Sequence, residues 1–213
     1  MMPNQNQQIQ NFITGQTTAW LQEDLLKMDQ EFPIAREDIV EGLAAAISRI
    51  CYKAYELQQT GNKGSAAYVC ISFLRTSLLE GNWQYRLDLY DEKLYVDSIE
   101  CTDTWELEFV WKHLKQRMSE LRETIRHSIY ANKVRFCHLN QIKLHMAEKY
   151  QLAAILLTKR LISEAIERLE DANISKAPVL TILMGEYRDH SVPLYEIRCD
   201  TAEKDETLCN TSD

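Results

Sequence analysis

The segment that decides the fold runs from Trp83 to Tyr90 and reads Trp-Gln-Tyr-Arg-Leu-Asp-Leu-Tyr. Apolar side chains occupy every second position, and polar or charged side chains lie between most of them. Successive side chains of a strand point to opposite faces, so this two-residue period predicts a half-buried strand. A turn at residues 91–93 and a returning strand at residues 94–97 complete a predicted β-hairpin.

The period of the apolar residues changes after this hairpin. Asp103 and Glu106 are spaced like a capping box at the start of a helix. The apolar residues that follow recur at steps of three and four, which predicts an amphipathic helix of six or seven turns. These apolar positions are Leu107, Val110, Trp111, Leu114, Met118, Leu121, Ile125 and Ile129.

Three helices are predicted before the hairpin. Apolar residues at helical spacing begin at Thr17, and Pro33 is expected to end this first helix. The second covers residues 36–59. The third covers residues 65–80, although residues 68–73 are rich in strand formers.

The second half of the chain predicts further helix and then two strands. Residues 136–171 form either one very long helix or two, with the weak point at residues 149–151. Residues 152–157 are apolar all round, which is typical of a helix buried on most sides. Residues 179–184 and 192–197 predict a second pair of strands, in which Pro193 favours an edge position.

These elements predict the α+β fold class, mostly helical, with long amphipathic helices packed on a small antiparallel sheet built from two β-hairpins. Crossover units with Gly-rich phosphate turns are absent, so a doubly wound parallel sheet is not expected. We expect a single domain over residues 13–199. A disordered Gln/Asn-rich tail is expected over residues 1–12 and a disordered acidic tail over residues 200–213.

Composition and charge restrict the partners. The chain has 213 residues, of which 45% are apolar and 26% charged, as is typical of soluble globular proteins. The net charge of −8 disfavours nucleic acid and anionic membranes, which attract basic surfaces. No stretch approaches the ~18 apolar residues of a membrane span, and the first residues do not resemble a secretory signal. We therefore expect a cytoplasmic protein that binds neither nucleic acid nor membrane.

The six cysteines are expected to be free thiols. No two of them are closer than ten residues in the sequence, so a zinc-binding spacing is absent. A reducing compartment favours thiols over disulfides. Cys51 and Cys70 lie among apolar positions and are interpreted as small core residues.

A candidate ligand site is centred on the first predicted strand. Arg86, Asp88 and Tyr90 share one face of this strand, and Arg75 and His190 are expected to approach it from neighbouring segments. Covered polar groups need partners, so these residues could line a pocket between helices and sheet. The alternative interpretation is the wet outer face of a half-exposed antiparallel sheet.

A metal site is a weaker possibility. Glu123 and His127 are one helical turn apart, and His138 and His145 lie two turns apart on the next helix. The amphipathic pattern turns Glu123 and His127 outward, and no H-E-x-x-H spacing is present. We therefore expect no metal and no cofactor.

No motif identifies an activity, so two functional hypotheses are kept. The first is a non-catalytic interaction or regulatory protein that self-associates, because long amphipathic helices present apolar stripes to a partner helix or second subunit. The alternative is an enzyme or small-ligand-binding protein with a pocket between the helices and the sheet.

Overall fold

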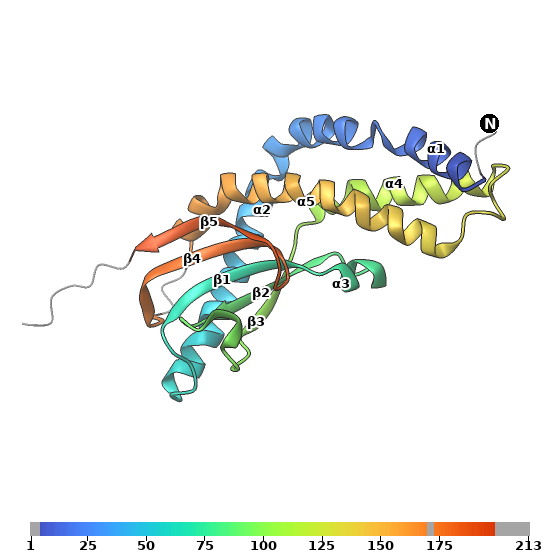
Figure 1. Ribbon diagram of the computed structural model, residues 1–213. Coiled ribbons are helices and arrows are strands. Elements are labelled where there is room, and N and C mark those ends of the chain that lie inside the picture. The colour runs from blue at the N-terminus through green and yellow to red at the C-terminus, as the bar shows by residue number, and fades with distance from the viewer. Residues whose placement is uncertain (1–4, 170–172, 199–213) are drawn as a thin grey trace, which may run out of the picture.

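The computed structural model describes residues 5–169 and 173–198 and has a mixed α+β fold (Figure 1). The elements in chain order are α1 (Gln5–Thr17), α2 (Trp20–Gln59), β1 (Ala66–Phe73), α3 (Arg75–Glu80), β2 (Gln84–Tyr90), the 3-10 turn η1 (Leu94–Val96), β3 (Thr102–Glu106), α4 (Glu108–Arg126), α5 (Phe136–Glu167), β4 (Lys176–Glu186) and β5 (Ser191–Arg198).

The five strands form one sheet in the order β3-β2-β1-β4-β5. β2 is antiparallel to β1 and β3, and β5 is antiparallel to β4, but β1 and β4 are parallel. The prediction of a purely antiparallel sheet is therefore wrong. The parallel pair arises because the chain returns to β1 only after the long connection through α4 and α5, as parallel strands require.

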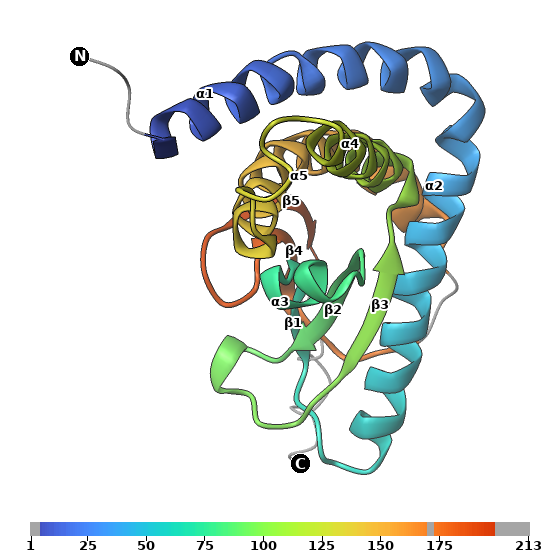
Figure 2. The same cartoon turned by 90° about the vertical axis from the view of Figure 1, so that its right-hand side faces the viewer.

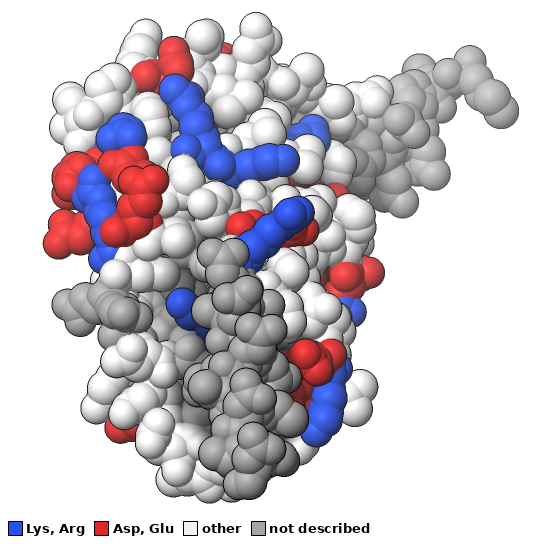
Figure 3. Space-filling view, turned by 90° about the vertical axis from the view of Figure 1, so that its left-hand side faces the viewer, with Lys and Arg blue, Asp and Glu red and all other residues white. Residues whose placement is uncertain are grey.

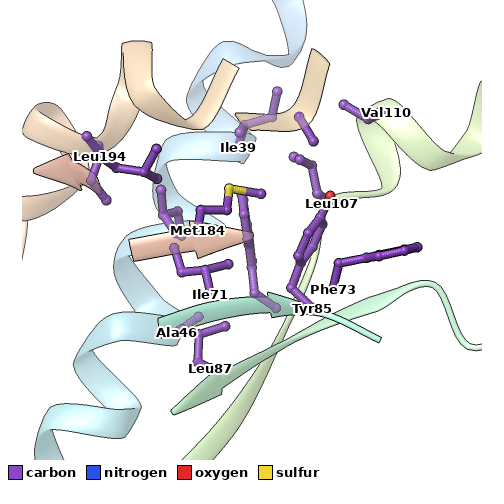
Figure 4. Close-up of a cluster of buried hydrophobic side chains, with 14 of the residues drawn as sticks. Ile39, Ala46, Ile71, Phe73, Tyr85, Leu87, Leu107, Val110, Met184 and Leu194 are labelled. Carbon is purple, nitrogen blue, oxygen red and sulfur yellow. The ribbon is translucent and has the colours of Figure 1, made fainter. Parts of the chain in front are cut away.

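The helices cover one face of the sheet. Figure 2 shows α2 along one side of the sheet and α4 and α5 across its top, whereas the opposite side carries only connecting segments. Tyr85, Leu87 and Leu89 of β2 belong to the core cluster and are fully buried. Figure 4 shows side chains from the sheet and from α2 and α4 pointing toward one another. The interface between helices and sheet is therefore a packed core.

Three predictions about strands need correction. Residues 66–73 form β1 instead of a helix, because a central strand buried on both faces reads as a continuous apolar run without alternation. The strand that follows β2 and returns beside it is β3, whereas residues 94–96 form a 3-10 turn. Asp103 lies inside β3 and caps no helix, since it pairs with Arg49 and Lys53 of α2.

The helix boundaries also differ from those expected. α2 is one helix of 40 residues that continues through Pro33. It bends between its two halves (Figure 2), as helices do at an internal proline. Residues 136–167 form a single helix, so the version with two helices is wrong.

Both edges of the sheet are protected against pairing with another chain. At β3, Arg49 Nη2 donates to the carbonyl of Thr104 at 3.0 Å, and Lys53 Nζ donates to the carbonyl of Thr102 at 2.8 Å. At β5, Pro193 has no N–H, and the register with β4 shifts beside it. Charged caps, prolines and bulges all hinder edge-to-edge association. The predicted edge position of Pro193 is confirmed.

The remaining expectations have mixed outcomes. Residues 5–12 lie in α1, where the sequence predicts a tail, and residues 200–213 lie outside the described residues. Among the described residues, no helix combines the length and the apolar character needed to span a membrane. Cys51 and Cys70 are free and buried, and burial raises their thiol pKa values to about 11 and about 12.

Candidate functional site

The face of the sheet that points away from the helices carries Arg86, Asp88 and Tyr90. They alternate along β2 with the core residues and therefore point to the opposite side. Arg86 Nε lies 2.9 Å from each carboxylate oxygen of Asp88, and Arg86 Nη2 donates to Glu100 at 2.7 Å. Asp88 is buried, and these ion pairs raise the pKa of Arg86 above its ordinary value.

Two connecting segments close over this ion pair. The turn between β4 and β5 places the ring of Tyr187 5.3 Å from the Arg86 guanidinium, and Arg188 hydrogen-bonds Tyr90. From η1, Tyr95 hydrogen-bonds Cys70 and Ser191. Burial raises the pKa of Tyr90 and Tyr95 above the ordinary tyrosine value. The polar groups of this face thus find partners within the chain.

The other two predicted site residues lie on neighbouring segments. Arg75 Nε is 2.6 Å from Glu186 Oε1, and its Nη2 is 3.2 Å from Glu148. His190 is exposed, and its backbone carbonyl accepts a hydrogen bond from Glu186. The structure therefore brings Arg86, Asp88 and Tyr90 together. These three residues meet on the face of the sheet that carries no helix, whereas the sequence predicted a pocket on the opposite face, between the helices and the sheet.

The metal candidates stay apart. His127 is exposed, with its Nε2 3.9 Å from Glu123, and His138 Nδ1 accepts a hydrogen bond from the backbone N–H of Arg135. Within residues 5–169 and 173–198, no group of three or more His, Cys, Asp or Glu side chains is arranged to hold a metal ion.

A second candidate surface lies on α5. The buried residues of this helix lie on one side, and Leu152 and Leu156 lie on the other with 64% and 69% of their surface exposed. The expectation that residues 152–157 are buried on most sides is therefore wrong. Residues four apart share a helix face, so the two leucines form one exposed apolar patch. Glu148 and Lys159 are also exposed and flank this patch along the helix.

A buried polar network joins α2, α4 and α5. Arg117 of α4 holds the carboxylate of Asp24 with its Nε at 3.1 Å and its Nη2 at 2.7 Å, and Tyr150 of α5 donates to the same carboxylate. Hydrogen bonds from Arg117 and Tyr150 lower the pKa of Asp24 although burial opposes them. Sequence reasoning missed this network, but the signal was present. Asp24 stands four residues from Trp20 and from Met28, on the buried stripe of the helix.

Comparison with known proteins gives no match to this chain, whether with family models, curated proteins or solved structures. On the side of the molecule shown in Figure 3, acidic and basic side chains lie beside one another instead of forming a patch of one sign. The features that can indicate a function are therefore the helix-free face of the sheet, the exposed face of α5 and the buried polar network around Asp24.

Proposed function

We propose that the protein is a non-catalytic interaction protein that self-associates through the exposed face of α5. The observation that carries the proposal is the pair of exposed leucines, Leu152 and Leu156, which lie one helical turn apart on α5. Exposed apolar patches on soluble proteins commonly mark interaction sites. The occupant we propose is the same face of a second copy.

The charges beside the leucines favour an antiparallel, two-fold arrangement. If Leu152 of one copy meets Leu156 of the second copy, the symmetry axis passes at position 154. Glu148 then comes level with Lys159 and Arg160 of the second copy, and the same attraction occurs twice. A two-fold interface must be self-complementary, and this sequence of Glu, two Leu and Lys meets that condition. Glu148 also contacts Arg75 at 3.2 Å, yet about half of its side chain remains accessible.

The expected interface is small. Residues 145–163 span about 27 Å of helix at 1.5 Å per residue. A strip one helix wide buries less than the ~800 Å² per partner of a standard stable complex. The net charge of −8 adds repulsion between copies. We therefore expect a dissociation constant in the micromolar range or above.

The other ways to associate have less support. Arg49 and Lys53 cap one edge of the sheet, and Pro193 interrupts the other. The alternative function, an enzyme or small-ligand-binding protein, stays a prediction based on Arg86, Asp88 and Tyr90, whose polar groups already pair within the chain.

Sedimentation velocity over a range of protein concentrations tests the proposal. The wild-type chain is expected to form dimers as the concentration rises. Two single variants, Leu156→Gln and Lys159→Glu, are each expected to stay monomeric. The charge swap Glu148→Lys with Lys159→Glu and Arg160→Glu is expected to restore the dimer, because it reverses the charges on both sides of each contact. Phe136→Gln is the matched control, since Phe136 is an exposed apolar residue at the start of the same helix.

Two results would contradict this function. One is a wild-type chain that stays monomeric up to millimolar concentration. The other is a dimer that tolerates Leu156→Gln as well as it tolerates Phe136→Gln.

A further inference from the structure

α2 performs two separate packing tasks on either side of Pro33. Residues 39–59 cover the sheet, whereas residues 20–32 lie over α4 and α5 (Figure 2). Pro33 offers no N–H to the carbonyl one turn earlier, so the helix lacks a hydrogen bond where it bends. The segment 20–32 is thus joined to the rest of α2 through a weakened point.

Charged contacts and the buried apolar side chains of Trp20 and Met28 together hold residues 20–32 in place. Asp24 is the centre, since it binds both Arg117 of α4 and Tyr150 of α5. Glu23 adds a second contact to Arg117 at 2.6 Å, and Glu31 pairs with Lys112 at 2.5 Å.

His113 of α4 is buried at this junction, with 6% of its surface exposed. Its Nε2 has no hydrogen-bond partner among the described residues and lies 3.6 Å from a carboxylate oxygen of Glu31. Charged groups of both signs surround the imidazole, and Tyr150 of α5 approaches through its bond to Asp24. The charged neighbours are Asp24, Lys27 and Glu31 on α2 and Lys112 and Arg117 on α4.

We propose that residues 20–32 form an acid-sensitive strap, which lifts from α4 and α5 about Pro33 when His113 gains a proton. In the closed state the imidazole is neutral and excluded from water. In the open state it reaches solvent, where the imidazolium is hydrated. Acid therefore favours opening without unfolding the sheet or the second half of α2.

The direction follows from proton linkage. Burial lowers the pKa of His113 below its ordinary value of 6.5, although Glu31 and Asp24 act in the opposite direction. The closed state therefore binds this proton less tightly than the open state. The contribution of neutral His113 to the stability of the closed state is therefore fully present above pH 6.5, and it is lost as the pH drops below that value. At pH 5.5 the open population rises by up to about tenfold, the limit set by one pH unit.

Other groups act in a different pH range. The pKa values of Asp24 and Glu31 are lowered from 3.8 and 4.5, so these carboxylates stay charged at pH 5.5. The interval from pH 7.5 to 5.5 therefore isolates His113 from the acid titration of its neighbours.

Hydrogen exchange read by mass spectrometry on the full chain tests the proposal at pH 7.5 and pH 5.5, after correction for intrinsic exchange rates. Peptides from residues 20–32 are expected to lose protection by up to about tenfold at pH 5.5. Peptides from residues 39–59 of the same helix are expected to keep theirs. His113→Gln should abolish the difference, and His127→Gln, at the exposed residue directly after α4, should leave it unchanged.

Three results would overturn the strap. One is equal protection of residues 20–32 at both pH values in the wild-type chain. A second is parallel loss over residues 39–59, which indicates global unfolding. A third is a His113→Gln variant that retains the full pH response. The wild-type comparison within one helix decides the matter even if His113→Gln does not fold.

Discussion

Gly185 of β4 occupies a position that admits no side chain. A Cβ atom built there would lie 2.1 Å from the carbonyl oxygen of His190 and 2.5 Å from the Cα atom of Ser191. Both atoms belong to the backbone of the β4–β5 hairpin, so no rotamer change relieves the contact. We predict that Gly185→Ala forces this hairpin apart.

The size of the effect follows from the distances. Real Cβ atoms essentially never approach another atom closer than 3.0 Å, so β5 must move by about 0.9 Å relative to β4. Overpacking costs typically 1–3 kcal/mol, and a clash between two backbones belongs at the upper end, about 3 kcal/mol. For a chain of this length that corresponds to a fall in Tm of about 6–12 °C.

Urea unfolding followed by circular dichroism and by tryptophan fluorescence measures this loss. Gly15→Ala is the control, because a Cβ atom at Gly15 meets nothing within 4 Å and α1 favours Ala by about 1 kcal/mol. The reasoning is refuted if Gly185→Ala unfolds within 0.5 kcal/mol of the wild type, roughly the spread of neutral surface substitutions.

Two further predictions concern buried groups. Asp24→Asn leaves Arg117 with only the half-exposed carboxylates of Glu23 and Glu120 as ion-pair partners among the described residues, and we expect a loss of about 3 kcal/mol in unfolding free energy, whereas exposed Asp29→Asn costs less than about 0.5 kcal/mol. Equal urea midpoints for the two variants would contradict the assignment of a buried ion pair. In a variant with Cys199 and Cys209 replaced by Ser, a thiol reagent should label one cysteine in the native state and four in urea. The protected thiols are Cys51, Cys70 and Cys101, and the reactive one is Cys137. More than one rapid native reaction would show that the core is more open than described.

Local sequence patterns predicted three of the strands. β2 alternates, so the side chains on its two faces could be assigned before the structure was known, although Asp88 and Tyr90 on the helix-free face are buried as well. The region from Val179 to Ile197 was likewise predicted as two strands, and the structure pairs them as β4 and β5.

The failures occur where tertiary packing overrides the local pattern. β1 is buried on both faces, so its apolar residues show no strand period and resemble a helix. Pro33 normally ends a helix, but contacts on both sides of it keep α2 continuous. The parallel pairing of β1 with β4 joins residues more than a hundred positions apart, and no local pattern encodes it.

The candidate site was anticipated only in part. Alternation along β2 correctly placed Arg86, Asp88 and Tyr90 on one face, but it could not show that Tyr187, about a hundred residues later in the sequence, comes to lie against Arg86. The apolar run at residues 152–157 suggested burial, yet two of its leucines stay exposed. Whether an apolar side chain stays exposed depends on the packing of all the other elements, so the sequence of one helix cannot show it.

The distance between two spin labels at Ser163 tests the antiparallel α5 pair most directly. The spin label is attached to a cysteine introduced by Ser163→Cys, in a variant in which Cys137, Cys199 and Cys209 are replaced by Ser. The remaining thiols, Cys51, Cys70 and Cys101, are buried and are expected to stay unlabelled. With the two-fold axis at position 154, the labels lie nine residues from the axis in each copy, about 27 Å apart along the helices. The account predicts a dipolar distance near that value. A distance near the ~10 Å spacing of parallel packed helices, or no dipolar interaction at concentrations where dimers should form, would contradict it.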